Sequence, residues 1–339
     1  MINKKFMTLL LSFGFMLSFL TFSPQIDAFV QAVKTNSDLD SAKSVFSWDA
    51  GAAQTANEQR LLDRIEKAAA ESYIPPVDAQ IDSVWKAIPG YNGREVDVEK
   101  TYKLMKQKKN QDKLVFIYRE VSPKVSLNDL PPNPIFKGNP NKKMVALMIN
   151  VAWGNEYLPM MLDVLKKENV HATFFFDGSW LKKNVALAKM IQKNGHELSN
   201  HAYSHKNMSQ LNRTQAVQEI VKTQQLLKTE LNVDNTLFAP PSGDYNQATV
   251  NIANELHLKT ILWTLDTVDW RNPSPGSIVQ KITTRVEPGT MILMHPTSSS
   301  SQALLQIIQA IKGKGLLLGT VSELISSTRI PDVETNLKF

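Results

Sequence analysis

Short apolar runs and helical patterns alternate along the chain from residue 143 onward. Residues 144–151 and 172–176 are apolar runs typical of buried strands, and residues 157–168 between them carry apolar side chains on one helical face. This alternation predicts a parallel sheet, either closed into a barrel or doubly wound, and the pattern alone leaves both open. Further strands are predicted at 197–200, 236–239, 260–265, 291–294 and 316–319, with helices at 180–193, 213–230, 247–256, 277–286 and 300–312.

A smaller module is predicted before this domain, over residues 56–125. Leu61, Ile65 and Ala68 fall at helical spacing, and the following Ile74-Pro75-Pro76 stops the helix. A second amphipathic helix is expected at 98–108 and an alternating strand at 113–121. The Pro-rich segment 126–143 is interpreted as a linker, because repeated proline disfavours both helix and sheet. The main domain then occupies 144–326, and 327–339 form a C-terminal tail.

The N-terminus predicts export. Lys4 and Lys5 precede an apolar run over residues 6–22, which is typical of a signal peptide or a membrane anchor within residues 1–29. Cleavage and retention both stay open, but lysines on the inner side place the bulk of the protein outside the cytoplasmic membrane in either case. Residues 30–55 have no apolar period and are interpreted as a tether. The absence of cysteine excludes thiolate metal sites.

Charge adds little to this interpretation. The 339-residue chain has a net charge of +6 and a pI near 9.2. This charge favours binding to an anionic wall polymer or membrane face. The alternative is that the lysines only solvate the surface. No basic run carries the interleaved aromatic residues of a nucleic-acid groove, so no nucleic-acid partner is expected.

Two histidines four residues apart, His201 and His205, provide the main chemical signal, since such a pair is suited to holding a metal. Three further segments, 239–243, 265–270 and 292–296, follow at ordered spacing. Together they resemble the polysaccharide deacetylase family, the NodB-homology enzymes of carbohydrate esterase family 4, over about residues 140–326. The resemblance implies an α/β fold, a distorted (β/α) barrel of about seven strands with its site at the C-terminal strand ends.

The resemblance also implies roles for single residues. His201 and His205 match the two histidines that hold a divalent metal, Zn²⁺ or Co²⁺. His295 matches the general acid, and Asp269 matches the carboxylate that orients it. The implied substrate is an N-acetylated cell-wall polysaccharide, peptidoglycan or spore cortex, because the segment 149–157 resembles a sporulation-associated subgroup. Residues expected to contact the sugar are Trp270, Pro241, Ser242 and Tyr245.

Four positions depart from the family pattern. Ala239 stands where the family has an arginine that steadies the base, and Ser242 stands where it has an aromatic residue; the other two lie in the first motif. Where the family has Thr-Phe-Asp-Asp-Gly, residues 148–152 are Met-Ile-Asn-Val-Ala, so that Asn150 occupies the position of the catalytic base and Val151 that of the third metal ligand. An amide has no useful basicity, and losing a general base costs about 10²- to 10⁴-fold in rate. Asp177, at the end of a neighbouring predicted strand, is either a replacement carboxylate or a helix cap.

Two functions therefore remain open. The first is a metal-dependent deacetylase with an altered metal site and impaired hydrolysis of the acetamide C–N bond. The second is a catalytically inactive pseudoenzyme that binds or scaffolds wall glycan. Metal binding is expected to be weak or absent in the second, because two neutral imidazoles fall short of the three protein ligands that hydrolytic zinc sites use.

Overall fold

The computed structural model describes residues 56–108 and 110–330. The chain divides into two compact units, residues 1–63 and 64–339. In the first unit the described residues form the start of helix α4 (Ala56–Glu71), where Gln59 Nε2 donates a hydrogen bond to Asp63 Oδ1 at 2.8 Å. The predicted signal, the tether and most of the tail lie outside the described residues. Among those described, no helix has the length and apolarity to cross a bilayer.

The start of the second unit is an α+β module with two antiparallel strand pairs. Strand β1 (Gln80–Asp82) pairs with β2 (Lys86–Ile88), and β3 (Gly93–Val96) pairs with β4 (Tyr118–Val121). Helix α5 (Val98–Gln107) connects β3 to the segment before β4. This agrees with the predicted small α+β module, although the ordered strand is shorter than residues 113–121.

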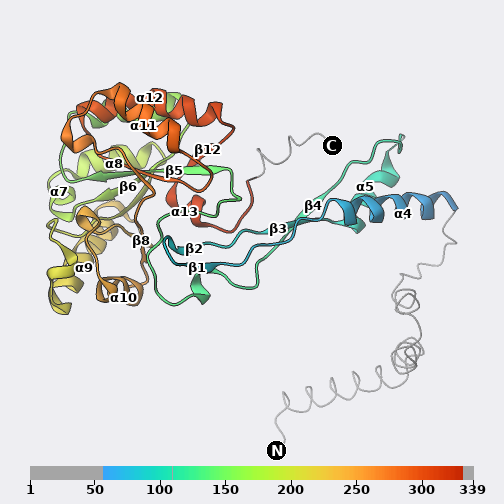
Figure 1. Cartoon of the computed structure of the whole chain (residues 1–339), viewed down its shortest axis with the longest axis horizontal. Coiled ribbons are helices and arrows are strands. Elements are labelled where there is room, and N and C mark those ends of the chain that lie inside the picture. Colours follow the sequence, from blue (N-terminus) through green and yellow to red (C-terminus); the bar gives the residue numbers. More distant parts are fainter. Residues whose placement is uncertain (1–55, 109, 331–339) are drawn as a thin grey trace, which may run out of the picture. The chain divides into compact units, whose positions relative to one another are not determined.

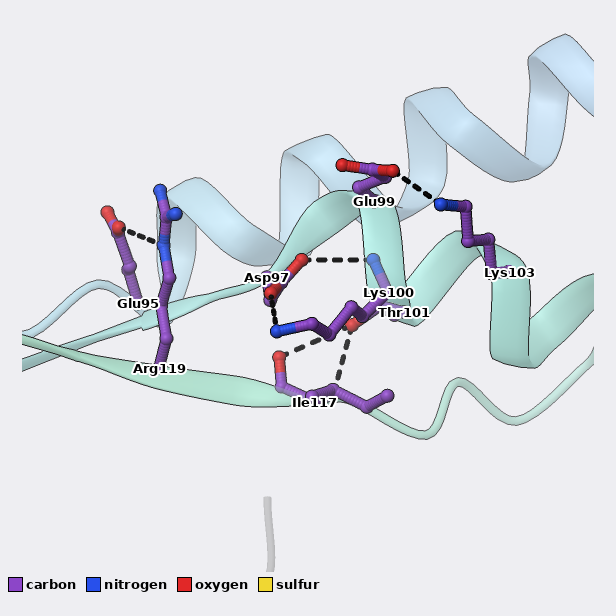
Figure 2. A network of polar contacts seen from close by, with 8 residues as sticks. All are labelled: Glu95, Asp97, Glu99, Lys100, Thr101, Lys103, Ile117 and Arg119. Carbon is purple, nitrogen blue, oxygen red and sulfur yellow. Dashed lines mark hydrogen bonds and ion pairs between the residues drawn. The ribbon is translucent and has the colours of Figure 1, made fainter.

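Polar contacts fix helix α5 against the segment leading to β4 (Figure 2). The Asp97 carboxylate caps the helix by accepting a hydrogen bond from the Lys100 backbone N–H at 2.9 Å. On the next turn, Thr101 Oγ1 accepts from the Ile117 N–H at 2.9 Å. The buried threonine thus satisfies the Ile117 N–H, while the Ile117 carbonyl accepts from the Asp97 backbone N–H at 2.8 Å, and both bonds join helix α5 to this segment.

The main domain is a curled parallel sheet with helices packed around it (Figure 1). Seven strands follow one path in the order β10-β11-β5-β6-β7-β8-β9, and β12 pairs with β5 beside that path. Every pairing in this sheet is parallel, so the predicted (β/α) barrel is confirmed in a half-barrel form. The strands are β5 (Met144–Val151), β6 (Thr173–Phe176), β7 (Glu197–Asn200), β8 (Leu237–Phe238), β9 (Lys259–Thr260), β10 (Leu265–Asp266), β11 (Met291–Met294) and β12 (Leu317–Gly319).

Strand β5 runs through the centre of the sheet with all eight residues buried. Its odd-numbered side chains, from Val145 to Val151, join the apolar cluster between sheet and helices. Its even-numbered side chains Met144, Ala146 and Met148 join a second cluster with Phe175 and Ile261. Because strand side chains alternate between faces, Asn150 continues the second set and Val151 the first.

The segment predicted as one strand over 260–265 is in fact two short strands. β9 pairs with β8 at one edge of the sheet, and β10 pairs with β11 at the other. Only residues 261–264 separate them, so the chain itself bridges the gap between the two sheet edges. Between the two strands, Ile261 forms an isolated parallel bridge with Ile135, so the predicted strand is interrupted at this point.

The helix predicted over 180–193 is likewise two helices, α7 (Gly178–Lys183) and α8 (Val185–Lys193). Asn184 breaks them with φ −129° and ψ 34°, while its Nδ2 donates to the Trp180 carbonyl at 2.8 Å. The other predicted helices agree with the structure to within a few residues: α6 (Leu158–Lys167), α9 (Arg213–Leu231), α10 (Gln247–Glu255), α11 (Pro275–Arg285) and α12 (Ser298–Gly313). A short further helix that was not predicted, α13 (Val321–Ile325), follows β12.

Candidate functional site

A cavity of about 380 Å³ lies at the C-terminal ends of β5, β7 and β11. Parallel strands bring the residues that follow them to one rim, which explains why segments far apart in sequence meet there. The cavity is lined by Asn150, Ala152, Trp153, His201, His205, Ser242, Trp263, Asp266, Trp270, Leu293 and His295.

His201 directly follows β7 and is 1 % exposed. Its Nδ1 lies 2.7 Å from the Ala239 carbonyl oxygen. A carbonyl only accepts hydrogen bonds, so Nδ1 carries the proton and Nε2 keeps a free lone pair. Burial, reinforced by the charge of nearby His205, lowers the pKa of His201 to about 3. The side chain is therefore neutral at physiological pH, as a metal ligand requires.

The loop that joins the two histidines takes an uncommon backbone conformation. Ala202 and His205 both have positive φ, 58° and 54°, and the His205 ring centroid lies 5.2 Å from that of His201. Glu219 on α9 holds the loop: its carboxylate accepts from the backbone N–H groups of Tyr203 at 3.1 Å and Ser204 at 2.8 Å. The buried glutamate thus stabilises a conformation that non-glycine residues rarely adopt.

Asp269 and His295 form a bonded pair on the opposite side of the cavity. Asp269 is fully buried, and its Oδ1 lies 2.8 Å from His295 Nδ1, while Oδ2 accepts from the His295 backbone N–H at 2.6 Å and from the Ser300 hydroxyl. Burial works to raise the pKa of Asp269, but the hydrogen bonds and charge of His295, together with Ser300, outweigh it and lower that pKa. The carboxylate therefore stays charged and orients the imidazole towards the cavity.

The end of β5 carries no comparable charge. Asn150 lines the cavity at 3 % exposure, and its Oδ1 is buried without a hydrogen-bond partner among the described residues. Val151 is fully buried in the apolar cluster with Ile149 and Phe176, and it does not line the cavity. The structure thus supplies neither a base nor a third metal ligand at these two positions.

Asp177 does not replace them. It caps helix α7, with Oδ1 accepting from the Trp180 N–H at 2.9 Å and from the Ser179 hydroxyl at 2.6 Å. It is buried, which raises its pKa, and it is absent from the cavity lining. Of the two interpretations of Asp177, the helix cap is the one that its contacts bear out.

The available donors do not fit a hydrolytic zinc site. Within residues 56–108 and 110–330, no group of three His, Cys, Asp or Glu side chains lies close enough to hold a metal ion. His201 and His205 offer two nitrogens, whereas such sites ordinarily use three protein ligands. No reaction step is therefore assigned to a metal at this cavity.

The predicted sugar contacts divide between the cavity and its surroundings. Trp270 and Ser242 line the cavity. Tyr245 instead packs edge-on against Phe136, with ring centroids 6.5 Å apart, and neither it nor the buried Pro241 is part of the lining. The roles of all four in binding stay predictions.

Five lining residues were not predicted as site residues from the sequence: Ala152, Trp153, Trp263, Asp266 and Leu293. Trp153 could have been found, because it comes two residues after Val151 in the segment already singled out. Trp263 could not, because its position depends on the break between β9 and β10.

A parallel half-barrel with a histidine pair and an Asp–His pair at its strand ends defines a NodB-type deacetylase fold. Residues 137–261 match the family described as "Polysaccharide deacetylase". The chain is also 32 % identical over 199 residues to a peptidoglycan-N-acetylglucosamine deacetylase of Bacillus cereus, covering 57 % of this chain and 72 % of that protein. The chain therefore belongs to the polysaccharide deacetylase family, carbohydrate esterase family 4.

Within this family the chain is similar to two proteins over most of its length. It is 45 % identical over 276 residues to the uncharacterized protein YlxY of Bacillus subtilis, covering 81 % of this chain and 86 % of that protein. A crystal structure of BA3943, described as a CE4 family pseudoenzyme from Bacillus anthracis, is 45 % identical, covers 80 % of this chain and 96 % of that one, and superposes with a TM-score of 0.73.

A mutant of BA3943, described as having restored enzymatic activity, is 44 % identical to this chain with the same TM-score and covers 80 % of this chain and 99 % of its own. The likeness to BA3943 includes the N-terminal module as well as the half-barrel, because it covers far more than residues 137–261.

Proposed function

We propose that this protein binds N-acetylated cell-wall glycan in the cavity at the strand ends, with hydrolysis of the acetamide impaired or lost. The observation that carries the proposal is that the histidine pair and the Asp269–His295 pair are kept, while Asn150 and Val151 occupy the two positions where the family has aspartates. The neighbouring BA3943 is described as a pseudoenzyme, which supports the same interpretation.

The chemistry favours binding over catalysis. Amide hydrolysis needs an activated water, an acid for the leaving amine and stabilisation of the developing charge. His295, held by Asp269, is suited to the acid role. Asn150 cannot take a proton from water, and the loss of a general base alone lowers rates about 10²- to 10⁴-fold.

The glycan itself is inferred from the relatives. The Bacillus cereus relative is named for acting on peptidoglycan N-acetylglucosamine. Half-exposed tryptophans around the cavity suit the apolar face of a sugar ring. We place the protein outside the cytoplasmic membrane, at the cell wall or spore cortex, on the basis of the apolar N-terminal run.

A second candidate is a working deacetylase with a reshaped metal site. It is favoured by His201, which is neutral and keeps Nε2 free beside His205. In that case His201 and His205 would be the residues that hold zinc or cobalt, with one protein ligand fewer than hydrolytic zinc sites ordinarily use.

One experiment separates the candidates. The full-length protein is incubated with peptidoglycan and with N-acetylchitooligosaccharides under Zn²⁺, Co²⁺ or Mn²⁺, and both bound glycan and released acetate are measured. Binding without acetate release is the expected result. Acetate release that His201→Ala abolishes would establish the second candidate. Absence of binding to either glycan would refute the proposed function.

A further inference from the structure

A second groove lies at the opposite ends of the strands from the histidine cavity. It consists of a cavity of about 550 Å³ and a neighbouring cavity of about 320 Å³, which share the lining residues Leu127, Asn128 and Lys259. Thr236 directly precedes β8 and Lys259 begins β9, so both stand at the N-terminal ends of their strands. The histidine cavity lies at the C-terminal ends and shares no lining residue with this groove.

The Pro-rich segment forms one wall of the groove and is held against the half-barrel. Ile135 forms a parallel bridge with Ile261, and its backbone N–H donates to the Thr260 carbonyl at 2.9 Å. Gln247 Nε2 on α10 donates to the Pro132 carbonyl at 3.0 Å. The segment predicted as a linker is thus fixed along the groove, and a ligand would meet a site that is already formed.

The lining combines apolar walls with neutral amides. The apolar side chains include Leu127, Leu130, Ile135, Val250 and Leu258. Asn128 and Asn254 are exposed, and their side-chain amides make no hydrogen bond with the described residues. An amide both donates and accepts, so each can pair with the N–H and C=O groups of an extended main chain. No Phe, Tyr or Trp lines the groove, so it offers no aromatic platform for a sugar ring.

The charge of the groove is set by two side chains, Glu255 and Lys259. Glu255 is already paired with Arg213. Lys259 is half-buried, and its Nζ makes no ion pair or hydrogen bond with the described residues. The groove therefore presents an uncompensated ammonium beside neutral amides, and a carboxylate is the complementary group.

We infer that this groove binds a short extended peptide that ends in a free carboxylate: Lys259 pairs with the carboxylate, while Asn128 and Asn254 hydrogen-bond to the main chain. Small apolar side chains of the peptide would pack on the leucine and isoleucine side chains of the walls. The inference goes beyond the proposed function and does not depend on it, because the two sites lie at opposite ends of the strands.

The test is calorimetric titration of the full-length protein with N-acetyl-trialanine and with its C-terminal amide. The parent is expected to bind the free acid about fivefold more tightly, the effect of a partly exposed ion pair at the upper end of its range. Lys259→Gln should abolish this preference, and Lys259→Arg should keep it. Asn128→Ala should weaken both peptides about fivefold, because each loses one hydrogen bond.

Variants outside the groove separate recognition from general effects. Lys281→Gln, on α11, is the matched lysine control and should keep the preference of the parent. Trp270→Ala, in the histidine cavity, should also bind both peptides as the parent does.

Three outcomes would overturn the inference. The first is equal affinity of the parent for the two peptides, or a preference that survives Lys259→Gln. The second is the absence of peptide binding, which would leave the proposed glycan binding untouched. The third is binding of N-acetylchitotetraose that Lys259→Gln weakens, which would assign the groove to glycan.

Discussion

The ends of β7 and β11 differ from the end of β5 in how their polar groups are bonded. On the first side, His201 Nδ1 is bonded to a backbone carbonyl, and Asp269 accepts from His295 and Ser300. On the second, Asn150 Oδ1 has no partner among the described residues and Val151 is packed in apolar surroundings. The first side carries hydrogen-bonded histidine and aspartate side chains, and the second carries no charged side chain at residues 150 and 151.

The polar groups at the ends of β7 and β11 find their partners within the protein. His201 is buried as a neutral ring, and the Asp269 carboxylate is compensated by the hydrogen bonds it accepts, so neither needs a cation to stay buried. The consequence is that catalysis should be recoverable by changes at β5 alone.

The largest expected effect tests this consequence. The double variant Asn150→Asp with Val151→Asp supplies a base and a third ligand beside His201 and His205. With zinc, acetate release from N-acetylchitooligosaccharides should rise at least about 10²-fold above the parent. Adding His201→Ala should return it to the parent level. If the double variant binds zinc and still releases no acetate, then residues 150 and 151 are not what limits catalysis in the parent.

The melting temperature of the Val151→Asp variant tests whether a carboxylate at residue 151 can bind zinc. Val151→Asp alone puts a carboxylate into the apolar cluster, so its melting temperature without zinc should fall below that of the parent. Zinc should restore it, because metal binding favours the folded state. A variant that zinc leaves unchanged would indicate that residue 151 cannot reach the histidines.

The next effect concerns the side at the ends of β7 and β11. Asp269→Asn removes the charge that the His295 and Ser300 hydrogen bonds stabilise, and should lower the unfolding free energy at pH 7 by about 4 kcal/mol. Since the folded pKa of Asp269 is lowered, its stabilisation is present above the unfolded value of about 3.9 and is lost as the pH falls through the folded pKa. Urea denaturation at pH 7 and pH 3 should therefore show a smaller difference between parent and variant in acid.

His196 provides a contrast with His201, because the two histidines flank strand β7. His196 lies immediately before the strand, and burial, with the charge of His171, lowers its pKa to about 4. The unfolded chain takes up a proton below about pH 6.5 that the folded ring refuses, so stability is lost as the pH falls from about 6.5 to about 4. In His196→Leu, the decrease in the free energy of unfolding between about pH 6.5 and pH 4 should be smaller than in the parent by about 3 kcal/mol, as measured by urea denaturation across that range. An unchanged pH dependence would show that His196 is already protonated in the folded state.

Much of the fold could be predicted because the strands are buried on both faces. The continuous apolar run of residues 144–151 leaves no alternative to a central strand, and β5 has the predicted bounds. The 260–265 segment could not be divided from sequence, because its break comes from pairing at two sheet edges. Periodicity reports burial and says nothing about which neighbour a strand will have.

The site, like the fold, could be predicted from the sequence only in part. His201, His205, Asp269 and His295 come together because each follows a strand of a parallel sheet, which sequence order can predict. The position of Trp153 against His295 depends on Gly154 packing against Pro296, a contact between segments more than 140 residues apart. The unpaired Oδ1 of Asn150 is equally a property of the packed site, since only the neighbours decide whether a buried amide is satisfied.

The smallest expected effect concerns Glu219, which holds the loop between the two histidines. The Glu219 carboxylate accepts hydrogen bonds from the backbone N–H groups of Tyr203 and Ser204 and from the Ser204 hydroxyl. Glu219→Gln keeps the shape of the side chain but replaces one of its two acceptor oxygens with an NH₂ group. The free energy of unfolding should therefore fall by about 1–2 kcal/mol. In the Val151→Asp background, calorimetry should also show weaker zinc binding, because His205 depends on this loop. Lys206→Ala, which removes an exposed partner 3.7 Å from Glu219, is the control and should change neither quantity appreciably. If the variant is less stable but binds zinc as tightly, then the position of His205 does not depend on the hydrogen bonds that Glu219 accepts from the loop.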